Sequence, residues 1–468
     1  MAALSLIAAL ALGSSKALAQ TTVSIPSSGA SAVAVSSSLF NTGFELASFP
    51  LFAQTYLSNP IGTKHATRIQ RIGPGFWPLT SNLAAANPLW QPQLNHLNTT
   101  GSLTIQDAQA MASGIGTSNI IAVEIGNEPN EYGGHSGGSA TNATYFSDRY
   151  QAIVANVSLA FGVGSTTPFF AGPDLATYDF HNKTDWSIET LFGTTDFDKT
   201  GNIKLATDHW YLTNGDTSIP DIMNHANMVN YSAPIAKAAK YFNTFTPHVD
   251  YVLDEFNVLN GGADLTFSSS LGSALASVDF MLYAMTLGVK RVHFEQAYGS
   301  NQAIWIPCNN GTSVLAQTHS GYYALITASE FIGGTSGNTR VQQITPGGND
   351  GSRFSAYVAY NGDTPNRVAL LNLNYWDQSQ PNTPRGQPNI QVSGIPSSLS
   401  SVKVEYLTNP GGAAQNADQT TFGGSQWPYS NLGMEKKGVQ NTTTSFPVKG
   451  GVASVAVPYS SIAIVYLS

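Results

Sequence analysis

The sequence predicts an α/β protein in which a (β/α)8 TIM-type barrel is followed by a C-terminal antiparallel β-sandwich domain. Two observations lead to this prediction. Between residues 38 and 298, runs with the pattern of buried strands alternate with helical patterns, which is the order expected of a parallel barrel. After Tyr323 the pattern changes to short alternating runs separated by Gly, Asn, Thr and Pro turns, which is typical of an antiparallel sandwich.

The length and composition set limits on the partners of this chain. Its 468 residues are enough for a barrel and a smaller module. Charged residues make up only 10% of the chain and the net charge is −8, with 20 Lys and Arg against 28 Asp and Glu. Because the sequence contains no basic run, we expect no nucleic-acid partner. A binding channel for a long polyanion is disfavoured for the same reason.

The N-terminus has the features of a secretory signal peptide. Ala2–Leu12 is apolar, and Ala17-Leu18-Ala19 forms a small-residue cleavage signal before Gln20. The apolar run is shorter than the roughly 20 residues needed to span a bilayer. We therefore expect residues 1–19 to be removed and the protein to be secreted, without a membrane association afterwards.

The single cysteine, Cys308, cannot form an internal disulfide, so stability must come from packing. Asn-x-Ser/Thr sequons are numerous, which together with a signal peptide suggests a glycosylated secreted protein, although some sequons are expected by chance in a chain rich in these residues. The sequons are Asn98, Asn142, Asn156, Asn182, Asn230, Asn310 and Asn441.

The predicted domain order is an N-terminal strand in residues 20–36 that joins the β-domain, a catalytic barrel in 37–323 and a β-sandwich in 324–468. Within the barrel, residues 76–85 are a weaker strand candidate, because Pro78 argues against an interior strand. The other predicted strands are 38–46, 66–73, 167–172, 203–211, 249–255 and 290–298, and the predicted helices are 104–114, 143–159, 222–242 and 268–287.

One part of the predicted barrel is short. Glu45 and Glu128 are 83 residues apart, whereas three βα units and a fourth strand usually need about 90–110 residues. We therefore expect an abbreviated segment near strands 2 and 3.

Two glutamates stand at the ends of predicted buried strands. An apolar run leads through Gly126 and Asn127 to Glu128, and Pro129 then ends the strand because it cannot donate a ladder hydrogen bond. A second apolar run ends in Glu255. The 127 residues between the two glutamates correspond to strands 4 and 7 of a barrel, whose carboxyl ends meet at one face.

Two carboxyl groups at one barrel face are suited to glycoside hydrolysis. One gives a proton to the leaving oxygen and the other attacks or stabilises the sugar carbon, while Asn127 can donate to the sugar 2-hydroxyl. Each glutamate could also be an ordinary surface residue. His209 and Trp210 could wall a pocket or simply pack. No His, Asp or Glu spacing is of the metal-ligand type, so we expect neither a metal nor another cofactor.

The motifs Gly126-Asn127-Glu128-Pro129-Asn130 and Asp254-Glu255-Phe256-Asn257, with the Gly-Gly pair that follows and the trailing β-module, resemble glycoside hydrolase family 79, the β-glucuronidase and heparanase-like family. The resemblance implies that Glu128 is the acid/base and Glu255 the nucleophile. It further implies roles in binding the sugar and its carboxylate for residues that also have plain structural interpretations. These residues are Glu45, Tyr211, Gly261, Gly262 and Tyr298.

This chain departs from the family pattern at one motif. The family commonly has Arg-x-Gly-Gly on strand 2, where this chain has Arg71-Ile72-Gly73-Pro74, so either the match is degenerate or a strand and its neighbour are missing. The function we expect is a secreted retaining exo-β-glucuronidase, acting on carbohydrates with terminal β-linked glucuronic acid, plain or 4-O-methylated. The alternatives are a heparanase-like endo-acting enzyme, which the low Lys and Arg content disfavours, and a non-catalytic glycan-binding cell-wall protein.

Overall fold

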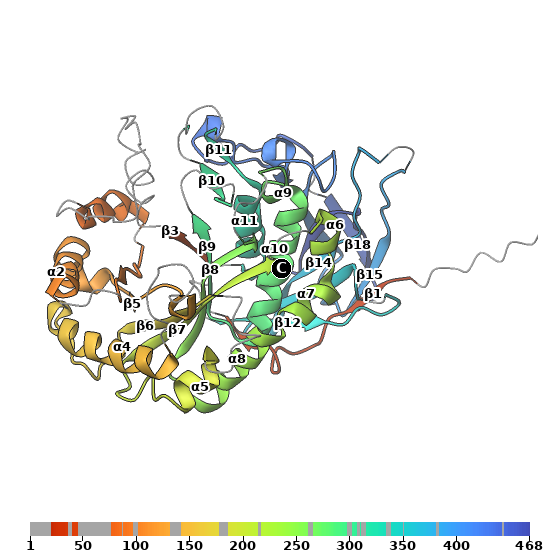
Figure 1. The fold of residues 1–468 in the computed structure, drawn as a ribbon. Helices are drawn as coiled ribbons and strands as arrows, with labels where there is room; N and C mark the ends of the chain where they lie inside the picture. The colour runs from red at the N-terminus through yellow and green to blue at the C-terminus, as the bar shows by residue number, and fades with distance from the viewer. Residues whose placement is uncertain are drawn as a thin grey trace, which may run out of the picture.

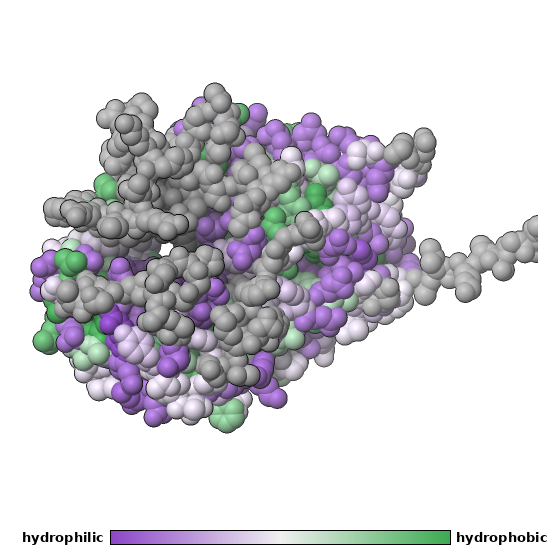
Figure 2. All heavy atoms as spheres, viewed as in Figure 1, coloured by the Kyte–Doolittle hydropathy of each residue, from purple (hydrophilic) through white to green (hydrophobic). Residues whose placement is uncertain are grey.

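The computed structural model contains two large sheets, one parallel and one antiparallel, with helices around and between them (Figure 1). Hydrophilic residues are spread over most of the described surface visible in Figure 2. Among the described helices, none combines the length and hydropathy of a membrane span. The structure describes residues 20–35, 40–44, 76–86, 88–96, 102–131, 142–176, 186–213, 217–260, 265–296, 302–306, 309, 315–333, 338–349, 351–380, 383–441 and 444–468.

The parallel sheet is the predicted barrel, and its neighbouring strands all pair in parallel. Its order is β3-β9-β8-β7-β6-β5-β4, and no strand within the described residues connects β3 to β4. The predicted strand at 66–73 lies outside the described residues. The strands are β3 (Phe40–Phe44), β4 (Gln93–Leu94), β5 (Val123–Ile125), β6 (Phe170–Leu175), β7 (Ile203–Thr213), β8 (Asp250–Leu259) and β9 (Arg291–Gln296).

Helices cover the outside of this sheet. Many of them begin at a residue whose side chain accepts a hydrogen bond from the first turn, such as Asn142 before α4 and Ser270 before α10. Helix α10 ends at Gly288, where φ is +93°, as helices commonly do. The helices are α2 (Ser102–Met111), α4 (Ala143–Val157), α5 (Ile188–Gly193), α6 (Ile219–Ile222), α7 (His225–Tyr231), α8 (Ala233–Phe245), α9 (Leu265–Ser268), α10 (Leu271–Leu287) and α11 (Ser320–Ile332).

Three predicted elements differ from the structure. Residues Trp77–Ala86 form a 3-10 helix rather than a strand, and the hydroxyl groups of Thr80 and Ser81 donate back to carbonyl groups of its first turn. Residues 222–242, expected to be largely helical, are helical over most of their length but are divided among the end of α6, α7 and α8, with Asn224 capping α7. The predicted boundary at residues 323 and 324 falls inside α11, which runs without a break.

The antiparallel sheet folds on itself as the predicted β-sandwich. The first strand of the described chain, β1, pairs in parallel with β15, and β2 pairs with β12. The order is β1-β15-β19-β18-β16-β20-β14-β13-β12-β2, with β17 beside β16 and a separate β10–β11 hairpin. The strands are β1 (Thr22–Ser24), β2 (Val33–Ala34), β10 (Trp305–Ile306), β11 (Gln317–Thr318), β12 (Thr339–Ile344), β13 (Phe354–Asn361), β14 (Thr364–Asn372), β15 (Asn389–Ser393), β16 (Ser401–Thr408), β17 (Thr421–Phe422), β18 (Thr444–Lys449), β19 (Val452–Ala456) and β20 (Ser461–Tyr466).

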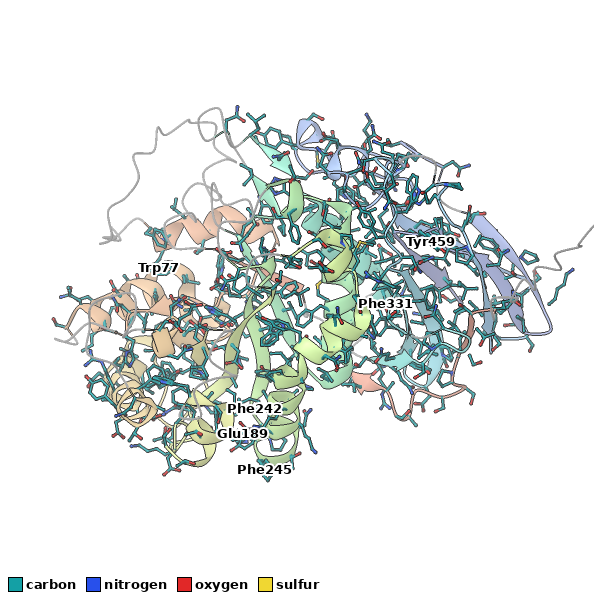
Figure 3. All side chains as sticks on the ribbon, turned by 45° about the vertical axis from the view of Figure 1, so that its right-hand side comes forward. Trp77, Glu189, Phe242, Phe245, Phe331 and Tyr459 are labelled. Atoms are coloured by element: carbon teal, nitrogen blue, oxygen red, sulfur yellow. The ribbon has the colours of Figure 1, made fainter. Side chains whose placement is uncertain are left out.

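The two domains share a hydrophobic core. Because side chains alternate along a strand, Ala356 and Val358 of β13 face the inside of the sandwich, whereas Tyr357 faces α10 and α11. Helix α11 contributes the fully buried Phe331 to this junction (Figure 3). The β-domain therefore packs against the barrel through these two helices.

A polar cluster is buried in this apolar junction. Asp279 of α10 accepts hydrogen bonds from the hydroxyl groups of Ser355 and Tyr357, at 2.7 and 2.9 Å, and its Oδ2 lies 2.8 Å from Nδ1 of His225. Burial alone would lower the pKa of His225, but the charge of Asp279 raises it above its usual value.

Asp279→Ala should lower the free energy of unfolding by on the order of 3 kcal/mol, because one imidazolium and two hydroxyl groups lose their acceptor. The raised pKa of His225 gives the sign of the pH dependence. The ionic part of this stabilisation should be complete below about pH 6.5 and should be lost as the pH rises through the folded-state pKa. Urea denaturation followed by circular dichroism measures both effects.

The matched control is Asp148→Ala, which breaks an exposed contact of 3.8 Å to Lys199 and should leave the denaturation midpoint nearly unchanged. Equal effects of the two substitutions would contradict a stabilising role for the buried cluster.

Candidate active site

Glu128 lies in a turn just beyond the end of β5. Gly126 and Glu128 both have positive φ, +98° and +47°, and the second value is uncommon for a residue with a side chain. The turn is held by the backbone, because the N–H of Glu128 donates to the carbonyl of Asp174 at 2.9 Å and Pro129 begins a short 3-10 helix. The carboxylate of Glu128 is 34% exposed, so a ligand can reach it from solvent.

Asp174 stands opposite this turn, at the end of β6, and it also has a positive φ, of +61°. Its side chain is fully buried. One carboxylate oxygen lies 2.6 Å from Nε2 of His209, and the other accepts from the side chain of Gln93 at 3.2 Å. Two neighbouring strand ends therefore both carry a strained acidic residue, which is a pattern that clusters at functional sites.

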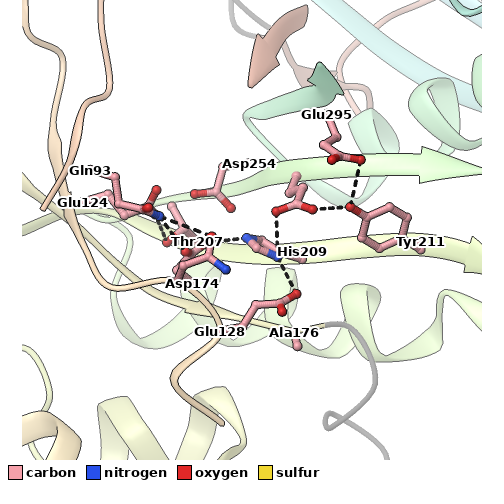
Figure 4. Close-up of polar contacts among 12 residues, drawn as sticks. Gln93, Glu124, Glu128, Asp174, Ala176, Thr207, His209, Tyr211, Asp254 and Glu295 are labelled. Atoms are coloured by element: carbon pink, nitrogen blue, oxygen red, sulfur yellow. Dashed lines mark hydrogen bonds and ion pairs between the residues drawn. The ribbon is translucent and has the colours of Figure 1, made fainter. Parts of the chain in front are cut away.

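His209 and Tyr211 of β7 point to the same side of the sheet because they are two residues apart. Nδ1 of His209 lies 2.9 Å from Oε1 of Glu128 (Figure 4). The same nitrogen lies 3.1 Å from Oε2 of Glu255 on β8. The two carboxylate oxygens are therefore within about 6 Å of each other, close enough for both groups to act on one bond. The Glu255 side chain is 26% exposed, so neither glutamate is sealed inside the barrel.

Several groups act on the acidity of Glu255. Burial raises the pKa of this carboxyl, whereas the charge of His209 and the hydrogen bond from the Tyr211 hydroxyl lower it. Burial and the nearby carboxylates raise the pKa of Tyr211, so its hydroxyl stays protonated and donates to Oε1 of Glu255. The same hydroxyl lies 3.4 Å from Oε2 of Glu295 on β9, a carboxylate that was not among the predicted site residues.

Further acidic groups lie deeper in the barrel. Burial and the charge of Asp174 raise the pKa of Glu124 to about 7, and Glu124 accepts a hydrogen bond from Thr207 at 2.9 Å. Asp254 accepts from Gln91 at 3.1 Å, and burial raises its pKa as well. Each of these acids interrupts an apolar strand in the sequence, a signal that could have identified them.

Donor atoms of Asp174, His209 and Asp254 lie within 4.8 Å of one another, a spacing that three ligands of one metal ion could have. However, Nε2 of His209 already approaches Asp174 to 2.6 Å, a hydrogen-bond distance that leaves no space for an ion between them. We therefore interpret this group as an ion-pair network.

The structure brings some of the predicted site residues together, places one in the core, and does not describe the others. The structure brings Glu128, Glu255 and Tyr211 together around His209. Asn127 is exposed beside Glu128, with its side-chain oxygen 3.5 Å from Gln93. Trp210 is fully buried and packs on the ring of Tyr231 at 5.1 Å, so it belongs to the core rather than to a pocket wall. Outside the described residues lie Glu45, Gly261, Gly262, Tyr298 and Cys308.

The raised pKa of Glu124 generates a prediction about stability. Between about pH 4.5 and 7 the folded protein holds a proton that the unfolded chain releases, so rising pH should destabilise the fold by about 1.4 kcal/mol per pH unit from this group. Glu124→Gln should remove that part of the slope in urea denaturation measured across this range.

Glu189→Gln is the control with the opposite sign. The ion pair of 2.9 Å with Lys237 lowers the pKa of Glu189 even though burial opposes this, so Glu189 stabilises the fold above its unfolded pKa and loses that effect as the pH falls. A Glu124→Gln variant with the wild-type slope would contradict the buried, protonated state.

The C-terminal β-domain matches a known family. Residues 356–464 match the glycosyl hydrolase family 79 C-terminal beta domain. A beta-glucuronidase of Aspergillus niger is 28% identical over 299 residues, which are 58% of this chain and 52% of that protein. A beta-glucuronidase of Neurospora crassa is 27% identical over 188 residues, which are 37% of this chain and 33% of that protein. The chain thus spans about half or less of the curated relatives it matches.

Solved structures share the fold. A 4-O-alpha-L-rhamnosyl-beta-D-glucuronidase from Fusarium oxysporum, in complex with Rha-GlcA, has a TM-score of 0.73 and 18% identity, covering 96% of this chain and 100% of that one. A family 51 arabinofuranosidase from Xanthomonas axonopodis has a TM-score of 0.52 and 16% identity, covering 84% and 78%. Residues 356–464 are thus similar to glycoside hydrolase family 79, the chain resembles two fungal beta-glucuronidases, and it shares its fold with the Fusarium enzyme.

Proposed function

We propose that this chain is a secreted, retaining exo-β-glucuronidase that removes terminal β-linked glucuronic acid from glycans or glycosides. The observation that supports this most directly is the approach of Glu128, just beyond the end of β5, and Glu255, within β8, to the same nitrogen of His209. The resulting limit of about 6 Å between their oxygens agrees with the roughly 5–5.5 Å separation of retaining glycosidases. The beta-glucuronidase relatives support the choice of sugar, and Ala17-Leu18-Ala19 supports secretion.

The reaction would proceed in two displacements. The ionised carboxylate of Glu255 attacks the anomeric carbon as the bond to the leaving oxygen breaks, and Glu128 gives its proton to that oxygen. Glu128 then takes a proton from water, the water oxygen bonds to the anomeric carbon, and the bond to Glu255 breaks. The configuration of the sugar is retained because it is inverted twice.

The described part of the site contributes to recognition of an anionic sugar. Burial raises the pKa of Glu124, Asp208 and Asp254, so at acidic pH these groups are neutral and do not repel a uronate. Asn127 is the proposed donor to the sugar 2-hydroxyl.

The family resemblance further suggests Glu45, Gly261, Gly262 and Tyr298 as groups that bind the sugar hydroxyls and carboxylate. A 4-O-substituted glucuronate is a candidate substrate, because the similar Fusarium structure is named for a 4-O-rhamnosylated one.

The first experiment is turnover of 4-nitrophenyl β-glucuronide, compared with the corresponding β-glucoside and β-xyloside. We expect the glucuronide to be cleaved with retention of configuration, as measured by proton NMR of the first product formed. Glu255→Gln should abolish turnover while binding of the substrate persists. Glu128→Gln should lose about 10²–10⁴-fold in kcat. Wild-type binding without cleavage would favour the glycan-binding alternative, and an active Glu255→Gln enzyme would remove this residue from the mechanism.

Tyr211→Phe should lower kcat/KM about 10–100-fold, because a hydrogen bond to a charged group contributes about 1.5–3 kcal/mol. The acidic limb of the kcat/KM profile should also move to higher pH, because loss of the hydroxyl raises the pKa of Glu255. The matched control is Tyr466→Phe, which removes a Tyr–Glu hydrogen bond of 2.5 Å to Glu405 in the β-domain. The control should have wild-type kinetics; a similar loss in both variants would indicate a general effect on folding.

A further inference from the structure

We propose that Asp174 and His209 form a positioning pair that keeps a positive charge between the two catalytic carboxylates and thereby determines the pH at which the nucleophile becomes ionised. This inference rests on the proposed function for its kinetic consequence. The pair itself is a property of the substrate-free protein.

The contacts of the His209 ring with three acidic side chains favour its doubly protonated form. Its Nε2 faces Asp174 at 2.6 Å, and its Nδ1 faces Glu128 at 2.9 Å and Glu255 at 3.1 Å. An ionised carboxylate can only accept hydrogen bonds, whereas a neutral imidazole donates at one nitrogen and has a lone pair at the other. With carboxylates on both sides, the imidazolium satisfies both contacts by donating at each nitrogen.

The surrounding structure holds this arrangement in place. The His209 side chain is only 3% exposed, so water does not compete for its nitrogens. The backbone carbonyl of Asp174 accepts a hydrogen bond from the N–H of Glu128 at 2.9 Å. This bond fixes the position of Asp174 relative to the turn that carries Glu128. Gln93 donates to the second oxygen of Asp174 at 3.2 Å, which fixes the orientation of that carboxylate.

The other titratable groups around His209 do not replace the pair. Asp208 precedes it on β7 and accepts a hydrogen bond from Tyr251 at 2.9 Å, while Glu124 approaches from β5 and Asp254 from β8. Burial raises the pKa of all three acids, so each tends to be neutral at acidic pH.

That leaves Asp174, Glu128 and Glu255 as the acidic groups in direct contact with the ring. Burial opposes a charge on His209, but the charges of Asp174 and Glu255 and the hydrogen bonds to Asp174 and Glu128 raise its pKa well above the usual range.

The positive charge has a definite effect on the nucleophile. The charge of His209 lowers the pKa of Glu255, against the opposing effects of burial and of Glu128. A neutral side chain at position 209 would remove this effect, so Glu255 would stay protonated to higher pH. If His209 only filled space, its replacement would change the rate without moving the pH profile of kcat/KM.

The kinetic test is the pH dependence of kcat/KM for His209→Gln on 4-nitrophenyl β-glucuronide. We expect the acidic limb to move upward by about one pH unit or more, in addition to any fall in kcat. The matched control is His225→Gln, which removes the histidine of the other buried His–Asp pair in the described part of the chain, with Nδ1 2.8 Å from Asp279. The control should lose stability but keep the wild-type limb. A His209→Gln profile that is lower but not displaced would overturn the proposal.

The second test does not need turnover. The chain has nine histidines, and in a sample with labelled imidazole rings the NMR signal absent from His209→Gln identifies His209. In the substrate-free full chain, we expect this ring to remain an imidazolium to a higher pH than an ordinary histidine and to lose its proton at lower pH in Asp174→Asn. Asparagine tolerates the positive φ at position 174, so this variant should fold. A neutral wild-type His209 at pH 6, or a titration unchanged in Asp174→Asn, would overturn the pair.

The two tests separate this inference from the proposed function. A wild-type chain that cleaves no glucuronide but shows a persistent imidazolium would refute the glucuronidase proposal and leave the pair intact. A cleaving enzyme with a neutral ring at position 209 would refute the pair alone.

Discussion

The two candidate catalytic carboxylates meet at a single atom, Nδ1 of His209. Two carboxyl groups within about 6 Å of each other in a partly buried site favour the state in which one of them holds a proton and the other is ionised. The imidazolium between Glu128 and Glu255 stabilises the ionised carboxylate of Glu255, and Asp174 on its far side keeps the ring charged. The remaining features of the site follow from the need to keep these four groups in register, although they come from four different segments of the barrel.

The arrangement requires a strained backbone at two of the four residues. Positive φ angles at Glu128 and Asp174 each cost about 1–3 kcal/mol and persist only where the surroundings determine them. Here the two residues are linked by a backbone hydrogen bond, and the side chain of Asn130 accepts from the N–H of Ala176 just beyond. The loops after β5 and β6 therefore support each other.

The sequence was sufficient to predict the barrel, the trailing sandwich and the strands that lead to Glu128 and Glu255, because each depends on a local run of apolar residues. The predicted end of the second strand at Glu255 was wrong, because β8 continues to Leu259. The partner of His209 could not be predicted in this way. Asp174 is 35 residues away, and their contact depends on the register of β6 against β7, which is interrupted by irregularities. The burial of Trp210 follows from strand alternation once its neighbours are known to face the site. The short 3-10 helix before β4 depends on side-chain hydrogen bonds that propensity does not reveal.

This chain is poor in charge overall, with 10% charged residues, yet acidic groups from β5, β6, β7 and β8 converge inside the barrel. Burying several carboxylates together is tolerable only if some stay protonated or are balanced by a cation. Both solutions operate here, since Glu124 and its neighbours hold protons and His209 holds a charge. The protonation that stabilises the interior at acidic pH also reduces the negative field that a uronate would meet. If the proposed substrate is correct, stability and recognition of an anionic sugar depend on the same protons.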